Sequence, residues 1–135
     1  MNVLFVAGFA TIVRDPEASA GLYIDGLGLP MERGDYPSTG EIEGVKHFGL
    51  WPLEQAAQSC FGSPDWPDDV PVPQATIEFE VADVAAAAAE LEAKGHVLVH
   101  AARVEPWKQE VARLLSPEGL LVGVCYTPWF HEGEG

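Results

Sequence analysis

The chain has 135 residues, of which 47% are hydrophobic; this composition supports one compact domain with its own core and argues against disorder. Its 7 basic and 21 acidic residues give a formal net charge of −14, so the surface repels phosphate backbones. The charge argues against nucleic acid as a partner. It favours a cationic ligand, although the solubility that it provides is a sufficient reason for it.

Except for Asn2, the first ten residues are apolar, and they predict a strand, not a signal peptide. No basic segment precedes them, and the apolar run ends at Arg14 and Asp15. No apolar run approaches the ~20 residues that a membrane span needs. Cys60 and Cys125 form no CxxC motif, and two such thiols are typical of a reducing compartment. We therefore expect a cytoplasmic protein that does not bind membranes.

The first half of the chain continues with a helix and two further strands. The helix begins at Asp15, an N-cap residue that is followed by Pro16 at the first helical position. The glycines within residues 26–28 end it. The expected strands cover residues 29–36 and 45–51.

The second half follows a connector. Residues 53–59 have helical propensity over a short length, and the four prolines of residues 63–73 exclude regular structure there. Strict alternation over residues 76–81 then predicts a strand with one apolar face. The later elements are a helix over residues 84–94 and strands over 97–102, 107–115 and 120–126.

The two halves echo one another. The run from Gly8 to Asp15 resembles the run from Thr76 to Asp83: both are strand-like, end in Val-x-Asp and lead into an alanine-containing helix. A repeat of this length predicts one supersecondary unit written twice. We expect an α+β fold of two βαβββ modules whose curved mixed sheets enclose a cavity, with helices outside. One domain of residues 1–135 would comprise module one (about 1–62), a connector (63–73) and module two (74–135).

Several short motifs in this order resemble the vicinal oxygen chelate superfamily, which includes glyoxalase I, bleomycin-resistance proteins and extradiol dioxygenases. These motifs are Ile12–Ser19, Leu22-Tyr23, Gly26–Gly28, Glu78–Asp83, Pro106–Gln109 and Ser116–Gly119. Together they cover nearly the whole chain. The resemblance implies the same two-module fold, a ligand cavity between the sheets and a homodimer.

The resemblance also implies metal ligands at three positions, where metal-dependent members carry His or Glu. In this chain the three positions hold Gly8, Thr76 and Gly123. A divalent ion needs several lone-pair donors converging on one point, and these residues do not supply them. We therefore expect no metal cofactor at the usual site.

A set of side chains remains as candidates for a ligand site on the inner faces of the strands. Glu78 and Glu80 share the strand face opposite the apolar one, so both are solvated or Glu78 projects into the cavity. In the cavity, Glu78 would bind a cation or act as a base. The candidate ligand-binding residues are Trp107, Gln109, Thr76, Glu78, His47 and Trp51.

Three functions agree with these observations. The favoured one is a metal-independent small-molecule binding protein that sequesters a cationic drug or metabolite, as bleomycin-resistance proteins do. The second is a glyoxalase-like lyase or isomerase, or a dioxygenase, with metal ligands displaced to His47, Glu78 or His100. The third is a non-catalytic accessory module.

Overall fold

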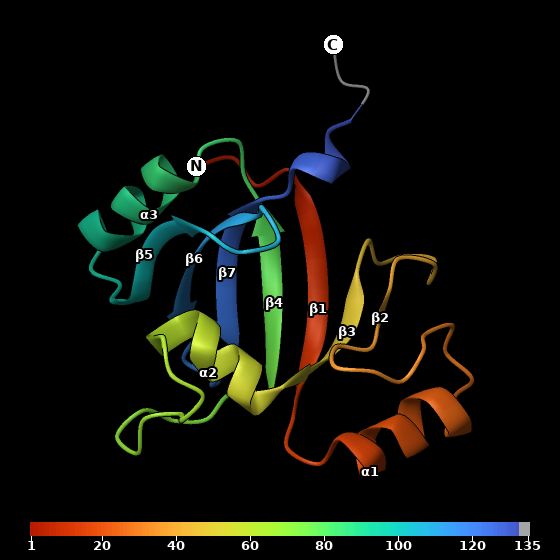
Figure 1. Cartoon of the computed structure of the whole chain (residues 1–135). Helices are drawn as coiled ribbons and strands as arrows, with labels where there is room; N and C mark the ends of the chain where they lie inside the picture. Colours follow the sequence, from red (N-terminus) through yellow and green to blue (C-terminus); the bar gives the residue numbers. More distant parts are fainter. Residues whose placement is uncertain (133–135) are drawn as a thin grey trace.

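The computed structural model describes residues 1–132 and contains a single mixed sheet that crosses the whole molecule (Figure 1). Its strand order is β2-β3-β1-β4-β7-β6-β5. The strands are β1 (Phe5–Val13), β2 (Ser38–Thr39), β3 (Phe48–Pro52), β4 (Ala75–Glu80), β5 (Leu98–Val104), β6 (Glu110–Leu115) and β7 (Leu121–Tyr126). The helices are α1 (Pro16–Ala20), which continues as a π-helix over Gly21–Gly26, α2 (Leu53–Phe61), α3 (Val84–Ala93) and a 3-10 turn over Pro128–Phe130.

The two expected modules are present, and their sheets join edge to edge. Strands β4 to β7 with helix α3 form a βαβββ unit, and β1, α1, β2 and β3 form its counterpart. The first strands of the two units, β1 and β4, pair antiparallel. The fold is therefore α+β with a mixed sheet, and its two halves correspond to the two echoes in the sequence. The last three residues assigned to module two lie outside the described part.

One predicted strand does not form. Residues 29–36 contain no strand, and the next pairing segment, β2, has only two residues. Met31 is buried in this stretch, against Val13 and Leu50, whereas the residues that follow it are exposed. Without an alternating buried face, the segment gains too little from burial to hold a full strand. The other predicted strands and both predicted helices form, with ends shifted by a few residues.

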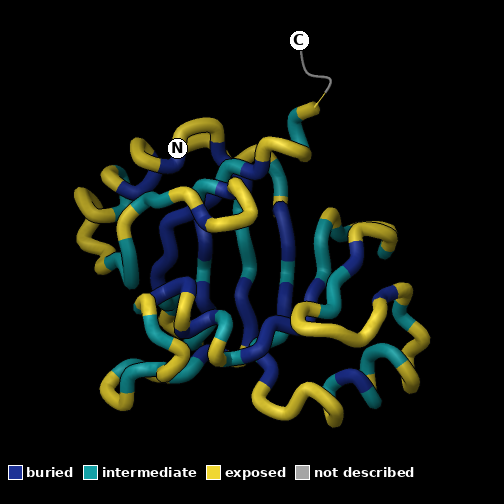
Figure 2. Tube along the Cα trace, in the orientation of Figure 1, coloured by how far each residue is buried: buried dark blue, intermediate teal, exposed yellow. Residues whose placement is uncertain are grey.

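The helices lie on both faces of the sheet. Helix α3 packs against Val81, Ala112 and Val124 on the outer face. Helix α2 packs against Ala10 and Leu121. The side chains of these two residues point to the inner face, opposite the face that α3 covers. The buried middle of the sheet and the exposed outer sides of the helices are visible in Figure 2. The short helix after Pro52 thus closes one end of the inner face, where the sequence predicted only helical propensity.

The two helix starts use the same device. The Asp15 carboxylate accepts from the backbone N–H of Ala18 at 3.2 Å, and the Asp83 carboxylate accepts from the N–H of Ala86 at 3.0 Å. Each aspartate satisfies an N–H group that has no partner within its helix. None of the helices in residues 1–132 has the length and apolar character that a membrane crossing requires.

Candidate functional site

A cavity of about 390 Å³ lies on the inner face of the sheet, between α2 and the C-terminal 3-10 turn. Five aromatic side chains contribute to its wall: Tyr36, Trp51, Trp107, Trp129 and Phe130. The polar side chains in the wall are His47, Gln55, Thr76, Glu78, Gln109, Arg113 and Thr127. A concave, mainly aromatic site with a few convergent polar groups is typical of small-molecule binding.

One row of residues across five strands passes beneath this cavity, and Gly8, Glu78 and Arg113 of the row line it. Strand pairing places Gly8, Glu78, Gly123, Arg113 and His100 side by side on β1, β4, β7, β6 and β5. A Cβ atom at Gly123 would lie 3.3 Å from Glu78 Cγ, so the glycine leaves room for the glutamate. Glu78 Oε2 and Arg113 Nη2 are 3.8 Å apart although a strand separates their backbones. The missing side chain at this position therefore allows a charge pair.

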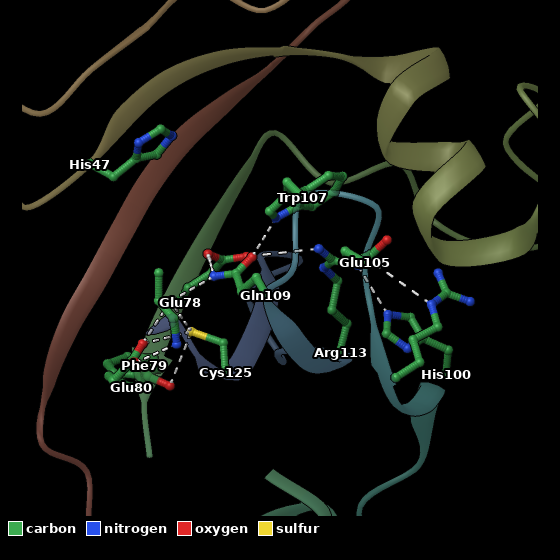
Figure 3. A network of polar contacts seen from close by, with 12 residues as sticks. His47, Glu78, Phe79, Glu80, His100, Glu105, Trp107, Gln109, Arg113 and Cys125 are labelled. Carbon is green, nitrogen blue, oxygen red and sulfur yellow. Dashed lines mark hydrogen bonds and ion pairs between the residues drawn. The ribbon is translucent and has the colours of Figure 1, made fainter. Parts of the chain in front are cut away.

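Gln109 holds Glu78 from the side (Figure 3). The indole N–H of Trp107 donates to Gln109 Oε1 at 2.9 Å, which fixes the orientation of the amide. The amide Nε2 then donates to Glu78 Oε1 at 3.1 Å and to the Thr127 hydroxyl at 3.0 Å. Every polar atom of the Gln109 side chain is thus in use, and within residues 1–132 Glu78 supplies the one carboxylate of the cavity wall.

Arg113 is completely buried, with 0% side-chain exposure, and is anchored from the β5 side. Its Nη1 donates to Glu105 Oε1 at 2.7 Å and lies 3.1 Å from His100 Nε2. Burial lowers the pKa of His100 to about 4, so the neutral ring accepts this bond while its Nδ1–H donates to the Ala101 carbonyl at 2.7 Å. The Trp51 ring lies 5.2 Å from the guanidinium carbon.

Glu80, two residues after Glu78, is completely buried below the cavity and is a structural residue. Its carboxylate accepts from the backbone N–H of Thr127 at 2.6 Å and from the Thr127 hydroxyl at 2.9 Å. Cys125 Sγ and His131 Nε2 lie 3.4 and 2.7 Å from its oxygens. These contacts tie the C-terminal segment, including the cavity-lining Trp129 and Phe130, to the centre of the sheet.

Tyr36 and His47 form a second polar pair on the opposite wall. Their Oη and Nε2 atoms are 2.7 Å apart, and the tyrosine ring covers Gly49, where any side chain would collide with it. Burial of its hydroxyl end raises the pKa of Tyr36, and Glu78 raises it further. Burial lowers the pKa of His47. The phenol therefore stays protonated and donates to a neutral imidazole at neutral pH.

All six candidate ligand-binding residues of the sequence line this one cavity. Trp107 stands at the mouth with 43% exposure, whereas Thr76, Trp51 and Gln109 are buried. Of the two glutamates, Glu78 faces the cavity and Glu80 is buried, so the alternative that both are solvated is wrong.

The sequence reasoning missed several residues around the site, of which Arg113 is the most important. Alternation along β6 from Gln109 through Val111 would have placed Arg113 on the inner face. Glu105 and Thr127 carried no comparable signal, because they lie outside the strands. Tyr36 ended the expected strand 29–36, which does not form, so its orientation could not be predicted from alternation.

The donor set does not fit a divalent metal ion. Gly8 and Gly123 offer no side-chain atom, and the buried Thr76 hydroxyl is a poor ligand. Residues 1–132 contain no group of three His, Cys, Asp or Glu side chains placed to hold a metal. His47 and His100 direct their Nε2 atoms at Tyr36 and Arg113, so they do not converge with Glu78.

Comparisons with known proteins agree on the fold. No family model and no curated protein matches the chain. A glyoxalase/bleomycin resistance protein/dioxygenase superfamily member from Vibrio splendidus 12B01 superposes with a TM-score of 0.57 at 14% identity, over 90% of this chain and 97% of that chain. Methylmalonyl-CoA epimerase from Mycobacterium tuberculosis gives 0.56 at 15% identity, over 95% and 91%.

A Streptomyces coelicolor methylmalonyl-CoA epimerase in complex with 2-nitronate-propionyl-CoA gives 0.54 at 15% identity, over 93% of this chain and 99% of that chain. The chain therefore has the vicinal oxygen chelate fold that its sequence motifs resemble. At these identities the similarity concerns the fold alone.

Proposed function

We propose that this protein is a metal-independent small-molecule binding protein whose cavity takes a ligand with an aromatic body and a cationic group. The observation that carries the proposal is Glu78, an ionised side chain at the floor of a cavity with aromatic walls. Sequestration of a cationic drug or metabolite is the role that such a site supports.

The charges around the cavity favour a cation. Glu78 and Arg113 are the ionised side chains in its wall, and Arg113 is already neutralised by Glu105 at 2.7 Å. His47 is neutral at neutral pH, because burial lowers its pKa. Glu105 also lies 3.7 Å from Arg103, a half-exposed side chain outside the cavity wall, so the charges of the whole cluster balance. Within the wall, Glu78 is the carboxylate that attracts a cation, and its nearest cationic atom, Arg113 Nη2, is 3.8 Å away. Aromatic faces add to this, since their quadrupoles attract ammonium groups.

Phenethyltrimethylammonium tests the proposal, because it combines a phenyl ring with a permanent cation. Isothermal titration calorimetry should show binding that exceeds that of 3-phenylpropionate, which has a similar body and the opposite charge. Glu78→Gln should weaken cation binding by about tenfold, the size of one desolvated charge contact. Glu92→Gln is the control, because Glu92 is exposed on α3, which packs on the face of the sheet opposite the cavity.

Metal analysis completes the test. Protein purified without chelators should contain no stoichiometric divalent ion. A bound nickel, zinc, iron or manganese ion at one equivalent, or equal affinity for the cation and the anion, would contradict the proposal.

Glu78 also supports a second function, metal-free proton transfer. Its carboxylate has 17% side-chain exposure inside an apolar cavity, where a base is more effective than in water. Phenacyltrimethylammonium has acidic protons between its carbonyl and its cation. Exchange of these protons in D2O, catalysed by wild-type protein and lost in Glu78→Gln, would identify an isomerase-like enzyme. Exchange at the buffer rate would leave a binding protein.

A further inference from the structure

The guanidinium of Arg113 is hydrogen-bonded through Nη1, whereas its opposite edge, formed by Nε and Nη2, makes no hydrogen bond. Nη1 contacts Glu105 and His100, whereas Nε and Nη2 have no hydrogen-bond partner although both are shielded from solvent. Nε–H and Nη2–H are the parallel donors with which arginine holds an oxygen-bearing group side-on. Glu78 Oε2 lies 3.8 Å from Nη2, too far for a hydrogen bond, so an acceptor that reached this edge would make hydrogen bonds that the folded chain leaves unmade.

Thr76 adds a third donor without a partner. It lies on β4 two residues before Glu78, on the same face of the sheet, and is 4% exposed. Its hydroxyl makes no hydrogen bond, and both Thr76 and Arg113 line the cavity. Two strands thus contribute residues with unsatisfied donors to the wall of one cavity.

Charge decides which acceptor suits these donors. Arg113 faces Glu105 at 2.7 Å and Glu78 at 3.8 Å, so the group around it has no excess positive charge. A carboxylate bound to the free edge would lie beside Glu78 and be repelled by it. A neutral oxygen with a strong dipole, the carbonyl of a ketone or amide, satisfies the donors without that repulsion.

We propose that Arg113 Nε and Nη2, together with the Thr76 hydroxyl, form a carbonyl-oxygen subsite at the inner end of the cavity. The proposal rests on the proposed function, since it concerns the same ligand, and it adds a carbonyl group to the aromatic body and the cation. Access requires a small movement, because the edge is covered. Rotation of Glu78, the partly exposed side chain beside Nη2, would uncover the edge and would break the hydrogen bond that Glu78 accepts from Gln109. Trp51, on the face of the guanidinium, is buried.

A matched pair of ligands tests the subsite. Phenacyltrimethylammonium and phenethyltrimethylammonium share the ring and the cation, and differ in a carbonyl against a methylene group. Calorimetry with the wild-type protein should give at least tenfold tighter binding of the ketone. Arg113→Lys keeps the charge but removes the side-on pair of donors. It should bring the ratio of the two affinities, ketone over methylene compound, close to one.

Thr76→Val should lower the ratio by about threefold to fivefold without disturbing Arg113. Its control is Thr11→Val, because Thr11 on the adjacent strand also has a buried hydroxyl without a partner but does not line the cavity. Thr11→Val should keep the wild-type ratio. If Arg113→Lys fails to fold, Thr76→Val alone decides the outcome.

A second pair, acetophenone and ethylbenzene, separates this proposal from the proposed function. If both cations bind equally well, the subsite is refuted and the cation site stands. If neither cation binds but acetophenone binds better than ethylbenzene in a Thr76-dependent way, the subsite stands and the cation site is refuted. Equal affinities within both pairs would mean that Glu78 itself satisfies Arg113 in solution.

Discussion

Arg113 is a buried charge that depends on its neighbours. Glu105, itself buried, holds Nη1 at 2.7 Å, and Trp51 covers the guanidinium. Removing one partner of such a pair leaves the other charged and desolvated. The contacts with Glu105 and Trp51 therefore explain how a positively charged side chain can be completely buried here.

The Arg113–Glu105 pair can be measured by a double-mutant cycle. Arg113→Met should lower the free energy of unfolding by about 3–5 kcal/mol, because Glu105 loses its nearest counter-ion and keeps only the half-exposed Arg103 at 3.7 Å. Arg113→Met combined with Glu105→Met should cost less than the sum of the two single changes. Urea unfolding of the four proteins measures this coupling. Additive losses would show that the two side chains contribute independently.

His100 makes stability depend on pH. Burial lowers its pKa from 6.5 to about 4, so below pH 6.5 the unfolded chain binds the proton more readily than the folded chain. The contribution of neutral His100 to the free energy of unfolding is complete above pH 6.5 and declines as the pH falls toward 4. We expect a loss of about 1–2 kcal/mol, less than the full shift implies because the ring is half-buried.

The comparison protein is His100→Gln, which keeps an acceptor for Arg113 but does not titrate. Its free energy of unfolding, relative to that of the wild-type protein, should rise as the pH falls from 7.5 to 5. A difference that does not change with pH would remove His100 as the cause.

At the scale of elements, the residues that begin each helix act in the same way in both modules. Asp83 caps α3, which has ten residues and buries only small side chains, Val84, Ala87 and Ala88. Because such a helix gains little from packing, its cap matters. Asp83→Ala should lower the free energy of unfolding by about 1 kcal/mol, the usual cost of a lost N-cap.

Chemical denaturation with Asp69→Ala as the control would measure this effect. Asp69 is an exposed connector residue that caps no helix. An equal loss in both variants would point to the removal of negative charge in general.

Two elements show why sequence pattern has limits. The segment 29–36 was predicted as a strand and is irregular, because a strand needs a neighbour and a buried face, and only Met31 is buried there. From the sequence, the segment that forms helix α2 is only a short stretch with helical propensity. Its position on the inner face depends on contacts with Ala10 of β1 and Leu121 of β7, which are distant in sequence.

At the scale of the whole molecule, the net charge of −14 opposes the compact state through self-repulsion. Raising the KCl concentration from 20 to 500 mM screens this repulsion and should raise the melting temperature by about 3–6 °C. Replacing Asp68 and Asp69 by Asn should raise the melting temperature at low salt and have little effect at high salt. A melting temperature that falls with salt would show that ion pairs dominate. The homodimer stays a prediction, which sedimentation would test.

Local periodicity and residue type were enough to predict the repeated strand–helix units, the capped helix starts and the α+β fold class. The resemblance to the superfamily added the three metal-ligand positions, two of which hold glycine, and six candidate side chains that line the cavity were named from the sequence. The three-dimensional arrangement was needed to show that Glu78 faces the cavity while Glu80 is buried, and that Gly123 leaves space for Glu78 to approach Arg113. Those facts depend on which strands become neighbours and in which register, and no single strand contains that information.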